Sequence, residues 1–172
     1  ADSHGQVPQG GPSPNLPTWP RVLRNLDGEA RAKRVFVQMM KERYSTIQSF
    51  NQVYGSAFSS FEGLLLAENW SLVTRQEKVD DGDDNDAFLL KILERYYTVA
   101  VKAIREVDAN HLIFGDIVNA NTGAPDEVIS LIGRHSDLLA YQYYGDYDEQ
   151  RQIIDCWSRL TGKPLFHADS CF

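Results

Sequence analysis

The second half of the chain alternates between amphipathic helical segments and short apolar runs, and this alternation limits the possible folds more than any other feature. Helices are predicted at about 87–107, 125–132 and 148–160, and strands at 111–116, 137–144 and 165–169. Alternating helices and strands with short connections form parallel sheets with right-handed crossovers. We therefore expect an α/β fold, and the alternation alone fits both a (β/α)8 barrel and an open, doubly wound sheet.

The first half contains a Pro- and Gly-rich segment followed by short helices. Proline and glycine are so frequent in residues 1–20 that they leave no room for a helix or a central strand. Apolar residues at helical spacing then predict helices at about 28–44 and 45–54, and a third that begins after an N-cap at Ser59 or Ser60. We expect two regions, a loop at 1–27 and an α/β region at 28–172.

Each predicted strand ends in side chains that can bind a ligand. Asp116 ends the first strand, Tyr143 and Tyr144 end the second, and His167 and Asp169 end the third. The carboxyl ends of neighbouring parallel strands meet at one edge of a sheet, where both barrels and doubly wound sheets build active sites. Because side chains alternate along a strand, we expect only one of the two tyrosines to face this site. His167 and Asp169 are expected to face the same side.

The sequence predicts no metal and no cofactor. No Gly-rich phosphate loop follows a predicted strand, and no His/Cys cluster has the spacing of a zinc site. The acidic segment 80–86 has the carboxylates that calcium prefers, but not the spacing of an EF-hand loop. We interpret it as a solvated loop whose last Asp or Asn caps the helix that follows.

The charge balance and hydropathy exclude two classes of partner. The 172 residues carry 24 acidic and 17 basic side chains, a net charge of −7, and the basic ones form no cluster. Nucleic acid is therefore not an expected partner. No apolar run approaches the roughly 20 residues of a membrane-spanning helix, so a membrane is not expected either.

Several segments in order resemble the (β/α)8-barrel glycoside hydrolases of the retaining clan that includes agarases and barrel β-galactosidases. The similar segments are residues 42–61, 96–97, 103–105, 108–116, 141–145 and 160–164. In that family they follow strand four and form strands five, six and the start of seven with their helices. The resemblance implies a partial TIM barrel at 28–172, with 1–27 as a loop on the active-site side. A whole barrel needs about 200–250 residues, so we expect a C-terminal fragment.

The resemblance also implies roles for two acidic residues. The family carries its nucleophile, usually Glu, at the end of strand seven, and Asp169 stands at the matching position. The acid/base belongs at the end of strand four, for which Asp2 is the nearest candidate. Two such carboxyl groups cleave a glycosidic bond. The ordinary alternative for Asp169 is a strand-end acid bound to an arginine or to backbone amides.

Further residues are candidates for contacts with a sugar. In the family a strand-six tyrosine bonds the nucleophile, so Tyr143 or Tyr144 is expected to take this part. Asp116, His167 and Trp19 are expected to contact the substrate. Each has a structural alternative: Asp116 as a cap or turn residue, His167 as a core histidine, and the aromatic residues as packing.

The function expected is that of a glycoside hydrolase, or a fragment of one, that cleaves an agarose-like or other galactose-containing polysaccharide. The expected partner is then the carbohydrate, and a secreted or periplasmic location follows. Association with the missing barrel half, or self-association through open sheet edges, is also expected. The alternatives are a non-catalytic or degenerate carbohydrate-binding barrel, and an unrelated doubly wound domain.

Overall fold

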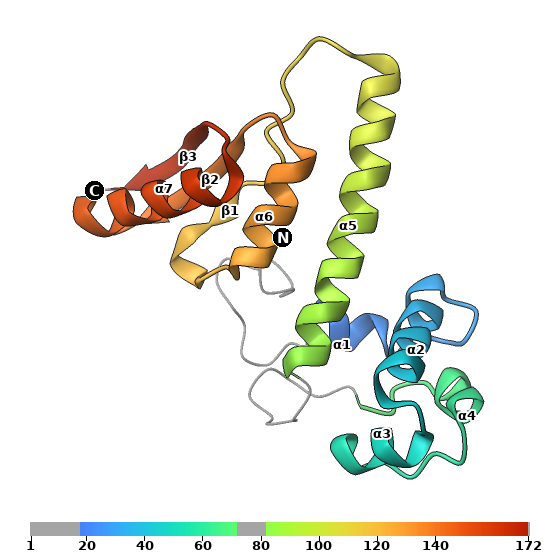
Figure 1. Cartoon of the computed structure of the whole chain (residues 1–172). Helices are drawn as coiled ribbons and strands as arrows, with labels where there is room; N and C mark the ends of the chain where they lie inside the picture. Colours follow the sequence, from blue (N-terminus) through green and yellow to red (C-terminus); the bar gives the residue numbers. More distant parts are fainter. Residues whose placement is uncertain (1–17, 72–81, 172) are drawn as a thin grey trace. The chain divides into compact units, whose positions relative to one another are not determined.

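The computed structural model describes residues 18–71 and 82–171, which form two compact units. The first unit ends at Leu89 and is helical, and the second begins at Leu90 and contains the sheet. Figure 1 shows the elements of each unit. The boundary falls inside the long helix α5 (Gly82–Val107). The two units are described separately below.

The helical unit consists of short helices and the first turns of α5. The others are α1 (Trp19–Leu23), α2 (Arg31–Tyr44), α3 (Ile47–Tyr54) and α4 (Phe61–Leu66). The Oγ atom of Ser60 accepts a hydrogen bond from the amide of Gly63, which confirms the predicted N-cap of α4. The prediction that residues up to 20 contain no helix is wrong for α1. Pro20 lies in its first turn, where a helix does not need the missing N–H.

The acidic segment also differs from its prediction, because α5 begins at Gly82 rather than after the acidic residues. Residues 80 and 81 lie outside the described residues. Asp84 is 2% exposed and accepts hydrogen bonds from the hydroxyls of Tyr44 (2.6 Å) and Tyr54 (2.8 Å). Arg43 Nε lies 2.9 Å from its other oxygen. A carboxylate near a helix N-terminus is favourable, and these partners make it part of the core.

A second charged group is enclosed in the same unit. The Arg24 side chain is fully buried, and its guanidinium lies 5.4 Å from the centre of the Tyr54 ring and 5.3 Å from that of Trp70. The amine of Lys33 donates to the carbonyl oxygens of Arg24 (2.6 Å) and Ala67 (2.8 Å). Burial, followed by the nearby Arg24 charge, lowers the pKa of Lys33 to about 8. This core is therefore specified by polar contacts as well as by apolar packing.

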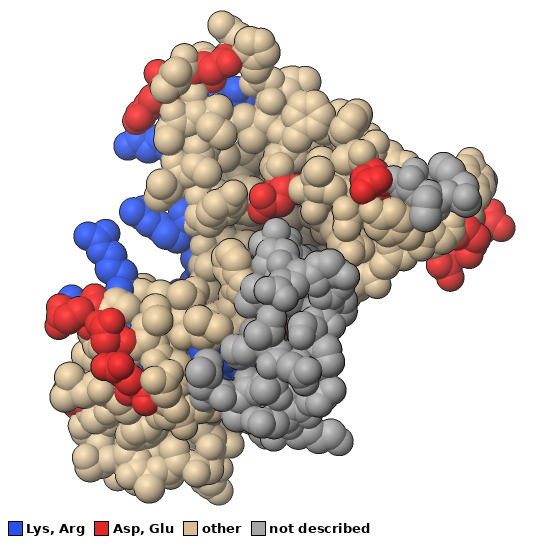
Figure 2. Space-filling view, turned by 180° about the vertical axis from the view of Figure 1, so that it is seen from behind, with Lys and Arg blue, Asp and Glu red and all other residues tan. Residues whose placement is uncertain are grey.

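Charged side chains on the surface form small groups. In the view of Figure 2, acidic and basic side chains lie next to one another in several places. One exposed pair joins Lys41 Nζ to Glu62 at 3.0 Å. Exposed pairs of this kind contribute about 0–1 kcal/mol. Among the described residues, no helix is both long enough and apolar enough to span a membrane.

The second unit contains a three-stranded parallel sheet in the order β1-β2-β3. Its elements after α5 are β1 (Val118–Asn119), the 3-10 turn η1 (Ala120–Thr122), α6 (Asp126–His135), β2 (Leu139–Tyr144), α7 (Tyr147–Thr161) and β3 (Leu165–Cys171). Helices α6 and α7 pack against each other, so both connections cover the same face of the sheet. The predicted α/β alternation is confirmed, and β2, α7 and β3 lie where the sequence predicts them.

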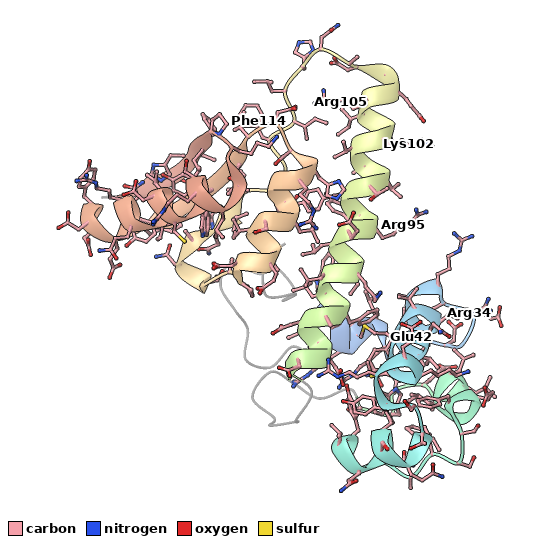
Figure 3. All side chains as sticks on the ribbon, viewed as in Figure 1. Arg34, Glu42, Arg95, Lys102, Arg105 and Phe114 are labelled. Carbon is pink, nitrogen blue, oxygen red and sulfur yellow. The ribbon has the colours of Figure 1, made fainter. Side chains whose placement is uncertain are left out.

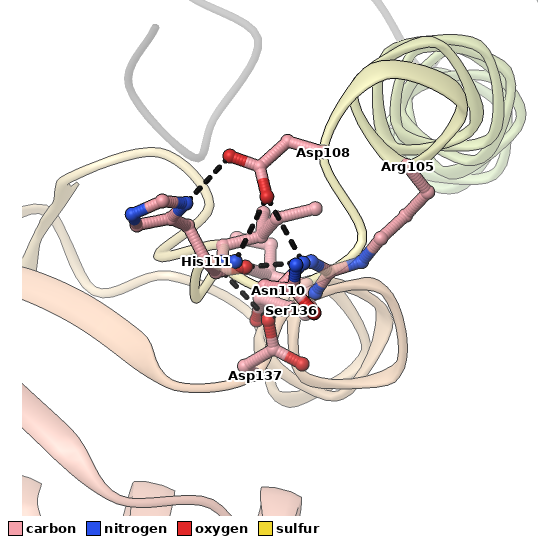
Figure 4. Close-up of polar contacts among 8 residues, drawn as sticks. Arg105, Asp108, Asn110, His111, Ser136 and Asp137 are labelled. Atoms are coloured by element: carbon pink, nitrogen blue, oxygen red, sulfur yellow. Dashed lines mark hydrogen bonds and ion pairs between the residues drawn. The ribbon is translucent and has the colours of Figure 1, made fainter.

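The strand predicted at 111–116 is not formed, and pairing begins only at Val118. Gly115 has φ 69°, a left-handed conformation that interrupts an extended chain. Two backbone hydrogen bonds still hold the segment, from the amide of Asp137 to the carbonyl of Ile113 (2.8 Å) and from the amide of Ala140 to the carbonyl of Phe114 (3.3 Å). Side chains add further contacts. Asp137 Oδ2 accepts the amide of Ile113 at 2.7 Å and also bonds Arg105 on the last turn of α5. Figure 3 labels Arg105 and Phe114 in this region, and Figure 4 shows the contacts around Asp137.

A bulge in β3 sets which residues share a face of the sheet. Tyr141 pairs with His167, but the next residue of β2, Gln142, pairs with Asp169. Ala168 is therefore an extra residue in β3. A bulge of one residue reverses the faces of all later side chains relative to the partner strand. Beyond Ala168, Asp169 lies on the face that Gln142 occupies.

The contact between α6 and α7 depends on a glycine. A Cβ atom added at Gly133 would lie 2.7 Å from the Cβ of Thr161. We predict that Gly133→Ala destabilises the second unit by about 1–3 kcal/mol, the usual cost of overpacking. Hydrogen exchange of the α6 and α7 amides would measure it.

Gly63→Ala is the matched control, because a Cβ there would meet its nearest atom at 3.7 Å. Replacing this helical glycine should stabilise α4 by up to about 1 kcal/mol. If the α6 and α7 amides exchange as slowly in Gly133→Ala as in the wild type, the two helices can move apart without loss of stability, and the prediction is wrong.

Candidate active site

The face of the sheet away from α6 and α7 carries a row of polar side chains at the carboxyl ends of the strands. Register places Asn119 beside Gln142, and Gln142 beside Asp169. Tyr144 lies two residues after Gln142 and therefore on the same face. We call these four residues, Asn119, Gln142, Tyr144 and Asp169, the polar row.

Two of the predicted site residues meet in this row. The hydroxyl of Tyr144 donates to Asp169 Oδ2 at 2.6 Å. The Asp169 side chain is exposed and Tyr144 is 40% exposed, so both can be reached by a ligand. A phenol bonded to one carboxylate oxygen fixes the carboxylate plane and leaves the second oxygen available.

His167 lies on the opposite face, against α7. Its ring stacks on Tyr141 with centroids 4.8 Å apart and an interplanar angle of 7°. Gln150 Nε2 of α7 lies 3.0 Å from His167 Nδ1 and 3.2 Å from the Tyr141 hydroxyl. The expectation that His167 and Asp169 face the same side is therefore wrong. The reason is the extra residue, Ala168, between them.

Tyr143 also faces the helices, as alternation with Tyr144 requires. Its hydroxyl donates to Glu149 of α7 at 2.6 Å. This hydrogen bond is the main reason that the pKa of Tyr143 is raised to about 12, since the carboxylate favours the protonated phenol. Of the two tyrosines predicted as alternatives, Tyr144 is the one placed beside Asp169.

Asp116 is bound to helix α5. The hydroxyl of Tyr97 donates to Asp116 Oδ2 at 2.9 Å. Burial, and then the Asp116 charge, raises the pKa of Tyr97. The ring of Tyr97 also stacks on His135, with the two ring centroids 5.8 Å apart. Asp116 is thus not part of the polar row.

The remaining two candidates lie elsewhere. Trp19 begins helix α1 in the helical unit rather than lying in a loop, and it is 37% exposed. Asp2 lies outside the described residues.

Three amide residues of the site were missed from the sequence: Asn119, Asn121 and Gln142. Asn119 and Gln142 belong to the polar row, and the side chain of Asn121 bonds the backbone of Tyr144. Asn119 ends the true strand β1 and Asn121 follows it; β1 starts two residues after the predicted strand ends. The signal was the run of residues 118–121, Val-Asn-Ala-Asn, which has the composition of a strand followed by a turn.

No group of three or more His, Cys, Asp or Glu side chains that could hold a metal ion is found in the described part of the chain. The chemistry available at the polar row is therefore that of one carboxylate, one phenol and neutral amides. Such groups bind hydroxyl-rich ligands, and a carboxylate can attack an electrophilic carbon or, when protonated, donate a proton to a leaving-group oxygen.

The Tyr143–Glu149 pair predicts a pH dependence of stability. The pKa is about 12 in the folded chain and about 10 in the unfolded chain, so the folded state retains the proton longer. The stabilisation is complete below pH 10 and is lost as pH rises from about 10 to 12.

Tyr143→Phe should therefore reduce the fall in unfolding free energy between pH 10 and 12, measured by urea denaturation at each pH. Other tyrosines with raised pKa values, such as Tyr97, are unchanged in the variant. An identical slope in the variant and the wild type would contradict the assigned pair.

Comparisons with known proteins support the fold. No known protein family and no curated protein sequence matches the chain. The fold is similar to part of three solved structures described as PfGH50B, the agarase AgWH50C and an exo-β-agarase. Their TM-scores are 0.67, 0.67 and 0.65, each at 20% sequence identity.

The similarity covers most of this chain and a minor part of the others. It includes 95%, 87% and 84% of this chain but only 23%, 21% and 19% of those proteins, in the same order. The chain thus spans about a fifth of the length of each. It has a glycoside-hydrolase-like fold in this part, which is the extent of the likeness.

Proposed function

We propose that the chain is a segment of a (β/α)8-barrel glycoside hydrolase. The strands follow one another in sequence order, and the helices between them cover one face. Consecutive strands of a barrel have this order, with every connecting helix on the outer face, and half of a doubly wound sheet has the same local arrangement. The barrel interpretation therefore rests on the fold likeness to the three solved structures. In this proposal residues 28–172 belong to the barrel, with strands five to seven, and residues 1–27 lie on the active-site side.

Asp169 acts in this proposal as the reacting carboxylate. The observation that carries it is the hydrogen bond of 2.6 Å from Tyr144 to Asp169 at the carboxyl ends of adjacent strands. The bond holds Oδ2 and leaves Oδ1 to approach the anomeric carbon. When the Asp169 carboxylate acts as a leaving group, the hydrogen bond from the Tyr144 phenol stabilises its negative charge.

The neutral amides of the polar row serve as contacts for sugar hydroxyls. The amide of Gln142 is partly buried between Asn119 and Asp169, and it makes no side-chain hydrogen bond within the described part of the chain. An amide can donate to one hydroxyl and accept from another. A hydroxyl next to the anomeric carbon would satisfy it.

Hydrolysis needs a second carboxyl group, and the other members of the polar row, Asn119, Gln142 and Tyr144, supply none. We assign this role to Asp2, as the sequence suggests. The separation of the two groups would decide the stereochemistry, since retention needs about 5–5.5 Å and inversion about 6.5–9.5 Å. Asp169 is one C–C bond shorter than the usual Glu, which lengthens any such separation.

The substrate class proposed is an agarose-like or other galactose-containing polysaccharide. It rests on the likeness to two structures described as agarases. Cleavage of an extracellular polysaccharide would require secretion or export to the periplasm. His167 keeps the packing role that its contacts with Tyr141 and Gln150 indicate.

Asp169→Asn tests the assignment directly. In the full-length protein we expect hydrolysis of agarose oligosaccharides to fall about a hundred- to ten-thousandfold, because an amide can neither attack nor exchange a proton. Product release is measured by chromatography of the oligosaccharides.

Asp155→Asn is the matched control, since Asp155 is an exposed acid on the same unit in α7. It removes the same charge and should leave turnover unchanged. Equal turnover in both variants would refute a reacting Asp169.

The second candidate function is that of a non-catalytic carbohydrate-binding barrel. It is favoured by Asp169, which stands at a position where the family usually has Glu. It predicts that agarose oligosaccharides bind with a heat measurable by calorimetry and are recovered intact. Asp169→Asn would then alter affinity alone, whereas the hydrolase proposal requires product from the wild type.

A further inference from the structure

The turn after β1 places one asparagine side chain against the end of β2. Strand β1 ends at Asn119, and the chain leaves the sheet through η1. Asn119 Oδ1 accepts the amide of Asn121 at 3.0 Å, and the hydroxyl of Thr122 donates to the carbonyl of Asn119 at 2.7 Å. These two bonds fix the turn and direct Asn121 back toward the sheet.

Asn121 makes two hydrogen bonds to the backbone of one residue. Its Nδ2 donates to the carbonyl of Tyr144 at 2.8 Å, and its Oδ1 accepts the amide of Tyr144 at 2.9 Å. The N–H and C=O of a strand residue point to the same edge, and in a parallel ladder two successive peptide groups of the next strand bond them. The single side-chain amide of Asn121 takes the place of those two peptide groups where β1 has already left the sheet.

We infer that Asn121 is a positioning residue for Tyr144 and, through it, for Asp169. The two bonds keep β2 extended as far as Tyr144, so that its side chain lies on the face of the polar row. The phenol then reaches Asp169 at 2.6 Å. This inference rests on the proposed function, because it assigns Asn121 to the site at which Asp169 would react.

The location argues against a role in the core. Asn121 and Tyr144 are both exposed, and their contact buries little apolar surface. Without the contact, the N–H and C=O of Tyr144 would lose these two bonds on the β1 side, and the last residue of β2 would be held less firmly.

A double-mutant cycle tests whether Asn121 acts through Tyr144. In the full-length protein, Asn121→Ala and Tyr144→Phe should each lower kcat on agarose oligosaccharides, by up to about a hundredfold, with little change in KM. The double variant should be no worse than Tyr144→Phe alone, because the misplaced phenol is already absent. Multiplicative losses would overturn the inference.

Two further variants separate positioning from shape. Asn121→Asp keeps the size and the acceptor for the Tyr144 amide, but it places a carboxylate oxygen against the Tyr144 carbonyl. The kcat of Asn121→Asp should fall nearly as much as that of Asn121→Ala. If the role of Asn121 were purely steric, the kcat of Asn121→Asp would stay near the wild-type value. Asn110→Ala, an exposed asparagine between α5 and β1, is the matched control and should retain full turnover.

Hydrogen exchange tests the contact between Asn121 and the Tyr144 backbone independently of catalytic activity. In Asn121→Ala the amide of Tyr144 should exchange at least about tenfold faster by NMR, while the amides in the centre of β2 stay protected. If the wild type releases no product, the proposed function fails, and this exchange measurement still decides the positioning role. Unchanged exchange of the Tyr144 amide would overturn that role whatever the activity.

Discussion

The extra residue in β3 is the constraint on which the polar row depends. In a regular strand without the bulge, Gln142 would pair with Ala168, and Asp169, two residues after His167, would face α7 as His167 does. The bulge is placed at the point where the strands change from packing against helices to presenting polar groups. Bulges are frequent next to active sites because they redirect one side chain without breaking the sheet.

The bulge also separates two sets of hydrogen bonds that would otherwise compete. On the helix side, Gln150 of α7 bonds both Tyr141 and His167, and Tyr143 bonds Glu149 of α7. The three strand residues are buried or half-buried. On the other side, Asp169 is bonded by Tyr144 and remains exposed. One face therefore stabilises the fold, and the other keeps its polar groups accessible to a ligand.

Much of this could be predicted from the sequence, where local signals agree with tertiary packing. The N-cap of Ser60 and the apolar stripes of α5 to α7 are read directly from residue types and spacing. Period-two alternation correctly predicts that one of Tyr143 and Tyr144 faces away from the helices. It does not identify which one.

The errors share a physical cause, which is that they depend on contacts between residues distant in sequence, and local patterns do not show such contacts. The segment around Phe114 is apolar and reads as a strand, but Gly115 turns the chain and Asp137 supplies a carboxylate to the Ile113 amide. The prediction that His167 faces the same side as Asp169 is wrong because period-two alternation does not reveal an inserted residue. The amide of Asn121 acts as a peptide group, and nothing in residues near it indicates this use.

The face of the sheet away from α6 and α7 is polar at the carboxyl ends of the strands and aromatic toward their amino ends. Phe166 pairs with Ala140 and so lies on this face, where it meets Phe114 edge-on with centroids 5.3 Å apart. Both rings remain partly exposed, at 48% and 39%. An aromatic layer beneath a polar layer is what the interior of a closed barrel requires, because side chains fill its lower part and ligands bind at its upper rim. The distribution of side chains on this one face therefore supports the barrel proposal independently of the order of the strands.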